Sequence, residues 1–86
     1  MTTLRLPRFL ADNANVDESH DVSGETVERA LDALFESEPI LRGHLMDEAG
    51  AIRQHVLFFV DGTQAELTSP IDATSEIRVI QAVSGG

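Results

Sequence analysis

The first apolar pattern along the chain has a period of two. Leu4 and Leu6 fall on one face of a segment over residues 3–10, and Thr3 and Arg5 fall on the other. This period is typical of a strand that is buried on one side. Proline cannot donate a ladder hydrogen bond, so Pro7 indicates a strand at a sheet edge or with a bulge.

A second, weaker strand is predicted over residues 16–22, where Val16 and Val22 are the clear apolar anchors. The segment between the two strands, residues 11–15, is polar and carries two asparagines, so we interpret it as a break. Because the connection is short, the first two strands are expected to form a hairpin.

The next pattern has the period of a helix. Apolar residues recur at intervals of three and four from Val27 to Leu34, which gives one apolar face. Thr26 stands where an N-cap is expected, and a threonine hydroxyl can accept a hydrogen bond from the first turn. Pro39 ends the helix near Ser37, because the residue before a proline avoids the α region. This segment is predicted to be the main helix.

Beyond this helix we expect one short helical turn and three strands, over residues 40–46, 54–60, 64–67 and 77–83. The short turn is expected to pack Ile40, Leu41 and Leu45. Asp61-Gly62 is a strong signal for a type I′ hairpin turn. The expected order is therefore β-β-α-β-β-β, an α+β domain with a mixed sheet of four to five strands and one main helix across it.

The period of two also assigns the faces of two of these strands. The residues expected to face the helix are Val56, Phe58, Val60, Ile77 and Val79. The residues expected to face outward are Leu57, Phe59, Arg78 and Ile80, and we call them the docking face because exposed apolar residues mark contact surfaces. The alternative is that loops cover them, or that a bulge reverses the register.

Composition narrows the classes of partner. The chain has 86 residues, enough for one small domain, with six basic residues against fifteen acidic ones and a net charge of −9. A surface this acidic disfavours nucleic acid and anionic membranes, and favours a partner with a basic docking surface. No stretch is long enough to span a membrane, and no signal peptide is evident, so we expect a soluble, cytoplasmic, monomeric protein.

No residue pattern indicates catalysis or metal binding. The string Ser19-His20-Asp21 cannot form a triad, because consecutive residues of a strand point to alternating sides. His20, His44 and His55 lack the spacing of metal ligands, and the absence of cysteine excludes thiol nucleophiles and cysteine-based zinc sites. The acidic pairs are more typical of solvated surface, and no phosphate-binding loop is present. We therefore expect a protein that is not an enzyme.

The sequence ends in Gly85-Gly86. Glycine is common enough that such a pair arises by chance in about one sequence in two hundred. A frayed, inert end is the alternative explanation. Glycine has no Cβ, so the pair can thread a narrow channel in another protein. A carboxylate presented in this way could be adenylated, which turns a poor electrophile into a good one.

These features together resemble the ubiquitin-like β-grasp proteins, and within them the ThiS/MoaD sulfur carriers. The segments that carry the resemblance are Gly24-Glu25-Thr26-Val27 followed by Ala30-Leu31-Asp32-Ala33-Leu34, then Val60-Asp61-Gly62, and finally Val83-Ser84-Gly85-Gly86. The resemblance implies a β-grasp domain over residues 1–83 and a flexible tail over 84–86.

The resemblance also implies a mechanism. A ubiquitin-activating-type enzyme would adenylate Gly86 with ATP and magnesium, and sulfur would then replace AMP to leave a thiocarboxylate. Ser84 and Gly85 would thread the tail into that enzyme while the docking face binds it. A biosynthetic enzyme would accept the sulfur, and a metalloprotease or hydrolase could process the C-terminus. The protein itself would bind no cofactor stably.

Three functions remain open at this point. A sulfur carrier could serve molybdopterin, cysteine, thiamine or specialised-metabolite synthesis. A protein modifier would instead be conjugated through Gly86 to lysines of its targets, and because all six basic residues are arginine it could not form lysine-linked chains on itself. The third alternative is a β-grasp interaction domain whose Gly-Gly end is inert.

Overall fold

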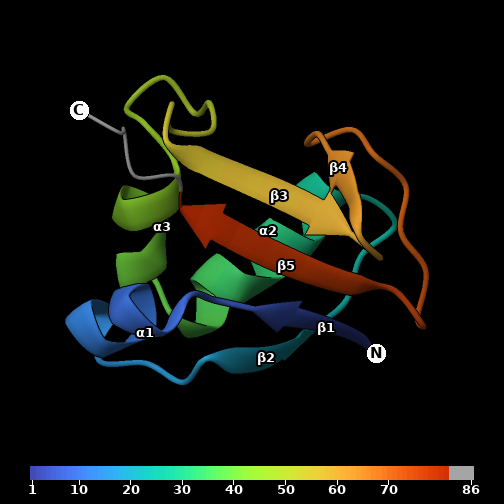
Figure 1. Cartoon of the computed structure of the whole chain (residues 1–86). Helices are drawn as coiled ribbons and strands as arrows, with labels where there is room; N and C mark the ends of the chain where they lie inside the picture. Colours follow the sequence, from blue (N-terminus) through green and yellow to red (C-terminus); the bar gives the residue numbers. More distant parts are fainter. Residues whose placement is uncertain (82–86) are drawn as a thin grey trace.

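A five-stranded mixed sheet organises the computed structural model, which describes residues 1–81 (Figure 1). The elements along the chain are β1 (Thr2–Arg5), α1 (Arg8–Ala14), β2 (Ser19–Val22), α2 (Val27–Ser37), α3 (Ile40–Leu45), β3 (Val56–Val60), β4 (Thr63–Ala65) and β5 (Glu76–Gln81). The strand order across the sheet is β2-β1-β5-β3-β4, with α2 crossing behind the sheet. β1 and β5 are parallel, and the other pairs are antiparallel. The expected α+β architecture with one main helix is confirmed.

The prediction for the start of the chain is partly wrong, because β1 ends at Arg5 and helix α1 follows. Pro7 is the N-cap of this helix, with φ −60° and ψ 143°. A proline is tolerated there because the first N–H groups of a helix have no partner inside the helix. β1 also lies between β2 and β5, so Pro7 does not mark a sheet edge.

Helix α1 replaces both the end of the predicted first strand and the predicted polar break. Leu10, Ala11 and Ala14 are buried on its inner side, at a helical spacing. Asn15 ends the helix in the left-handed region, with φ 58°, which asparagine tolerates better than most residues. The first two strands are still antiparallel neighbours, but a helix rather than a tight hairpin connects them.

The main helix α2 begins and ends as predicted. The Oγ1 atom of Thr26 accepts a hydrogen bond from the Arg29 backbone N–H at 3.3 Å. The loop after β4 accepts two further N–H groups of the first turn, through the backbone oxygens of Ser69 and Leu67. Those contacts satisfy N–H groups that have no partner inside the helix, so they fix the N-terminus of α2 to the loop after β4. Its buried residues are Val27, Ala30, Leu31, Leu34 and Phe35.

The short helical turn after Pro39 is confirmed as α3, with one correction. Leu41 and Leu45 are buried as expected, but Ile40 is 55% exposed. Ile40 is the first residue of the helix, and a helix this short buries only the side that faces the core.

The hairpin prediction is confirmed. Asp61 and Gly62 have φ values of 49° and 88°, the two positive values that a type I′ turn requires. The flanking strands are shorter than predicted: β3 begins at Val56, and β4 ends at Ala65. β2 likewise begins at Ser19, and β5 is described to Gln81, so the predicted residues 82–83 of the last strand lie outside the described part.

The core lies between the inner face of the sheet and the helices. The inner side chains Leu4 of β1 and Ile77 of β5 are 0% exposed, and Phe58 of β3 is 1% exposed. Each fully buried side chain of this size contributes about 1.5–3 kcal/mol relative to exposure. The opposite face of the sheet carries no helix of the described chain, so its side chains are free to form a site (Figure 1).

Candidate functional site

The outward face of β3 and β5 carries the four residues of the predicted docking face. Val56 and Phe58 are buried, whereas Leu57 and Phe59 between them are half-buried. On β5, Ile77 and Val79 are buried, whereas Arg78 and Ile80 are exposed. Burial therefore follows the predicted alternation, except that Val60 is half-buried rather than buried.

The strand register brings these four residues together. Leu57 lies opposite Ile80, and Phe59 lies opposite Arg78. Directly opposed residues of adjacent strands have side chains on the same face, about 5 Å apart at Cβ. The docking face is thus a contiguous surface of two rows. One row, Leu57 and Ile80, is apolar, and the other places Phe59 next to Arg78.

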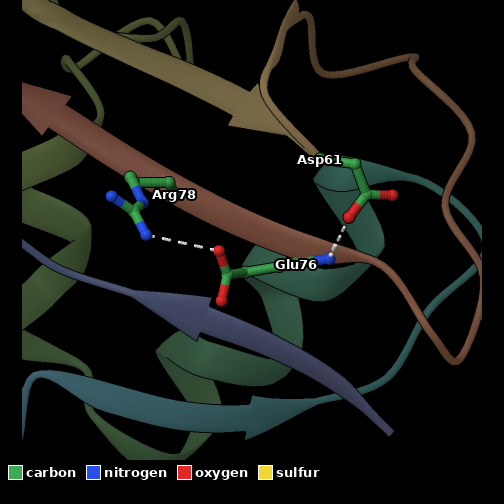
Figure 2. Close-up of polar contacts among 3 residues, drawn as sticks. All are labelled: Asp61, Glu76 and Arg78. Atoms are coloured by element: carbon green, nitrogen blue, oxygen red, sulfur yellow. Dashed lines mark hydrogen bonds and ion pairs between the residues drawn. The ribbon is translucent and has the colours of Figure 1, made fainter.

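A groove of about 270 Å³ marks one side of this surface, lined by Phe59, Asp61, Gly62, Glu76, Arg78 and Ile80. Figure 2 shows the polar contacts among three of these residues, Asp61, Glu76 and Arg78. Glu76 Oε1 accepts from Arg78 Nη2 at 3.4 Å, and Asp61 Oδ1 accepts from the Glu76 backbone N–H at 2.9 Å. The Asp61 backbone N–H also donates to the Glu76 carbonyl at 3.0 Å. These bonds join the hairpin turn to the start of β5, beside the Arg78 side chain.

The ion pair between Arg78 and Glu76 is exposed to solvent. The side chains of Arg78 and Glu76 are 56% and 43% exposed, and ion pairs in water contribute about 0–1 kcal/mol. The pair therefore adds little stability. Its consequence is that the guanidinium group remains available to a competing carboxylate.

The structure also places Arg5 and Phe9 beside the docking face, although the predicted site residues do not include them. Arg5 is the register partner of Arg78 across the β1–β5 pair, and Phe9 of α1 is 49% exposed. The period of two already put Arg5 on an outward face, but only the sheet order shows which strand lies next to it. The helical spacing of Leu10, Ala11 and Ala14 was the signal in the sequence that could have placed Phe9 on the outer side of a helix.

The predicted tail residues Ser84, Gly85 and Gly86 lie outside the described residues, as does the predicted domain boundary at residue 83. The described part of the chain leads into them through β5, whose last residue, Gln81, is paired with Val56. β5 lies between β1 and β3. β3 pairs with it up to Gln81, whereas β1 pairs with it only up to Arg78.

The polar residues considered above as catalytic or metal-binding candidates do not form such a site in the described residues. His20 Nε2 lies 2.7 Å from the Asp17 carbonyl oxygen, and Ser19, His20 and Asp21 follow one another along β2. Over residues 1–81, no group of three or more His, Cys, Asp or Glu side chains could hold a metal ion. None of the helices in this range is long and apolar enough to cross a membrane.

Asp72 is a carboxylate with a shifted pKa, just before β5. A hydrogen bond from the Thr74 hydroxyl to Asp72 Oδ1, at 2.7 Å, and another from the Thr74 backbone N–H lower the pKa of Asp72 below its ordinary value. Asp72 is fully exposed, and its contacts all lie within its own loop or with Thr2, whose Oγ1 donates to the Asp72 carbonyl. This carboxylate orders a turn rather than marking a catalytic centre.

Comparisons with known proteins agree with this geometry. A family model described as the ThiS family matches residues 7–86. The crystal structure of SAMP1 from Haloferax volcanii is 31% identical, with a TM-score of 0.82, and the match covers 99% of this chain and 98% of SAMP1. No match was found among curated proteins.

Two bacterial structures share the fold at lower identity. CysO in the BexX/CysO complex of Amycolatopsis orientalis is 18% identical, with a TM-score of 0.87 and full coverage of both chains. CysO of Mycobacterium tuberculosis is 20% identical, with a TM-score of 0.85, and the match covers 96% of this chain and 100% of CysO. These likenesses confirm the ubiquitin-like β-grasp fold. ThiS-family proteins are sulfur carriers and not catalysts, so the expectation of a protein that is not an enzyme is also confirmed. On the match over residues 7–86, the chain belongs to the ThiS family.

Proposed function

We propose that this protein carries sulfur on the carboxylate of Gly86. A ubiquitin-activating-type enzyme uses ATP and magnesium to form the acyl-adenylate and releases pyrophosphate. Hydrosulfide then attacks the acyl carbon, and AMP leaves as the thiocarboxylate forms. Where a persulfide supplies the sulfur, the acyl disulfide that forms is reduced by a thiol to the same product. A biosynthetic enzyme of the cytoplasm accepts this sulfur.

The observation that carries the proposal is the family match, because it extends to Gly86. Ser84 and Gly85 precede the reacting carboxylate, and small residues allow a narrow channel to admit it. The docking face, made of Leu57, Phe59, Arg78 and Ile80, gives the activating enzyme a surface beside the strand that leads to the tail. In this proposal the free protein is a monomer, and a metalloprotease or hydrolase removes any residues that follow Gly86.

The receiving pathway is one that consumes sulfur as a thiocarboxylate: molybdopterin, cysteine, thiamine or specialised-metabolite synthesis. The structure of CysO with BexX shows such a relative bound to a partner protein. It supports a partner enzyme for this chain, without choosing among the four pathways.

Intact-mass spectrometry tests the proposal. The protein is incubated with ATP, magnesium, an activating enzyme and sulfide, and we expect a mass gain equal to the replacement of one oxygen by one sulfur. A chain without Gly86 is the control, and it should remain unchanged. An unchanged mass for the full chain, with the same enzyme active on another carrier, would refute the proposal.

A second function is supported by the 31% identity to SAMP1. A further structure of the Haloferax volcanii protein, 28% identical, describes it as small archaeal modifier protein 1. As a modifier, this chain would be joined through Gly86 to lysines of other proteins. Gly-Gly remnants on target lysines, detected after digestion of cells that express the chain, would support this function. Their absence from cells in which the thiocarboxylate forms would exclude it.

A further inference from the structure

The pairing between β1 and β5 stops halfway along β5. The last paired residues are Arg5 and Arg78, because the chain leaves the sheet after Arg5 and enters α1. On the other side, β3 pairs with the whole second half of β5, up to Gln81. Residues 79–81 therefore have a strand neighbour on the β3 side, and within the described chain no strand follows on the other side. A partner can add an extended segment at an open strand edge of this kind.

A groove of about 450 Å³ lies at this open edge. We call it the β1–β5 groove, and the lining residues that matter here are Arg5, Phe9, Glu18, Arg78, Ile80 and Gln81. Phe9 and Ile80 are 49% and 39% exposed, which makes them two of the four large apolar residues that the described chain exposes. The groove thus offers apolar contacts to a protein partner.

The same groove concentrates positive charge on an acidic protein. The whole chain has six basic residues and a net charge of −9, yet Arg5 and Arg78 are direct neighbours across two strands. Arg78 is paired with Glu76, whereas within residues 1–81 no carboxylate lies within 4.0 Å of the Arg5 guanidinium group. Glu18, which also lines the groove, lies 4.0 Å from Arg8 instead. Two adjacent guanidinium groups are suited to binding a carboxylate with more than one hydrogen bond.

The open strand edge points to a peptide rather than to a small anion. Within residues 1–81, residues 79–81 of β5 have no strand neighbour on the β1 side. The backbone of an extended segment can pair with such an edge, while the arginines bind an acidic side chain of the same segment.

We infer that the β1–β5 groove binds an extended segment of the activating enzyme that carries an acidic residue next to an apolar one. This inference rests on the proposed function, and it adds the chemistry of the partner segment and a second surface, beyond β5, to the docking face. Carboxylate recognition falls to Arg5 and Arg78, and Phe9 and Ile80 hold the apolar neighbour. The net charge of −9 disfavours a nucleic acid or an anionic membrane as the occupant.

The test compares Arg5→Glu with Arg29→Glu, which makes the same charge change at an exposed residue of α2. Binding of each purified variant to the activating enzyme is measured by titration calorimetry, and thiocarboxylate formation by intact mass. We expect Arg5→Glu to weaken binding about tenfold or more, and Arg29→Glu less than about twofold, since close charge pairs are local. Arg5→Lys should give an intermediate loss because lysine cannot bind a carboxylate in the forked geometry. Thermal melting of each variant confirms that it is folded.

A second substitution tests the apolar half of the groove. Phe9→Ala removes an exposed ring from α1 without changing charge, and we expect it to weaken binding about fivefold or more, as for interface anchors. Equal binding by Arg5→Glu and the unchanged protein would overturn the inference, and so would equal losses in Arg5→Glu and Arg29→Glu. Tighter binding by Arg5→Glu would also overturn it, because this would indicate that the chain's own C-terminal segment occupies the groove.

The two proposals fail in different ways. If the unchanged protein forms no thiocarboxylate with an enzyme that is active on another carrier, the proposed function fails. If it forms the thiocarboxylate and Arg5→Glu binds equally well, the groove inference alone fails.

Discussion

Gly24 lies where the loop before α2 presses against the first turn of that helix. A Cβ at this position would lie 2.7 Å from Arg29 Cβ, 2.8 Å from the Ala30 backbone nitrogen and 2.9 Å from the Arg29 carbonyl carbon. Distances below 3.0 Å require the neighbouring atoms to move. Most of these atoms are backbone, and the Thr26 cap and the bonds from the β4 loop hold this turn in place. We therefore predict that Gly24→Ala destabilises the fold.

The magnitude follows from two opposing effects. Forcing a methyl group into a packed site costs about 1–3 kcal/mol. Replacing glycine stiffens the unfolded chain and returns about 0.4–1 kcal/mol. At the middle of both ranges the net loss is about 1.3 kcal/mol, which corresponds to a fall in Tm of about 5–10 °C for a domain of this size.

Gly43 provides the matched control for this substitution. It lies within α3, and a Cβ there would meet nothing within 4 Å. Gly43→Ala should therefore stabilise the protein by about 0.5–1 kcal/mol, because alanine favours a helix over glycine. Urea unfolding and calorimetric melting of the two variants give both numbers. The reasoning is refuted if Gly24→Ala is as stable as the unchanged protein, or if both substitutions change stability in the same direction.

Three further predictions concern the core, the docking face and pH. Phe58→Ala should cost about 3–5 kcal/mol in urea unfolding, because the ring is 1% exposed and leaves a cavity; a loss below 1 kcal/mol would contradict the core position. Ile80→Ser should slow thiocarboxylate formation severalfold at limiting enzyme, whereas Ile40→Ser, on α3 and 55% exposed, should not, and equal rates would argue against the docking face. Hydrogen bonds from Thr74 lower the pKa of Asp72 below its ordinary value of 3.8. These bonds therefore stabilise the folded state fully above pH 3.8, and this stabilisation is lost as the pH falls through the lowered pKa. The Tm of Asp72→Asn should therefore depend less on pH in that range, and parallel profiles would contradict this.

Local signals in the sequence were sufficient for some elements. The cap at Thr26, the stripe from Val27 to Leu34 and the break at Pro39 locate α2, because each signal acts within one or two turns. Asp61-Gly62 likewise defines the hairpin, because the turn needs two residues that tolerate positive φ. The faces of β3 and β5 followed from the period of two alone.

The elements that were missed depend on tertiary structure. Pro7 is compatible with a strand edge, a bulge or the start of a helix, and only the departure of the chain from the sheet after Arg5 distinguishes them. The place of β1 in the middle of the sheet depends on its pairing with β5, more than 70 residues further along the chain. Without that pairing, Arg5 and Arg78 have no visible relation in the sequence. The candidate site was therefore predictable on the β3–β5 side and not on the β1 side.

The parallel pairing of β1 and β5 has a mechanical consequence. The first and last described strands run side by side in the same direction, so a pull between the two ends of the chain loads all their hydrogen bonds together in shear. Force applied through the C-terminal segment first reaches residues 79–81, which pair with β3 alone, and then the part of β5 that pairs with both β1 and β3. A pull on the C-terminal end therefore acts on an interior strand of the sheet and not on an edge strand. Separating the two ends by force requires the β1–β5 hydrogen bonds to break together, which raises the resistance of the domain to such a pull.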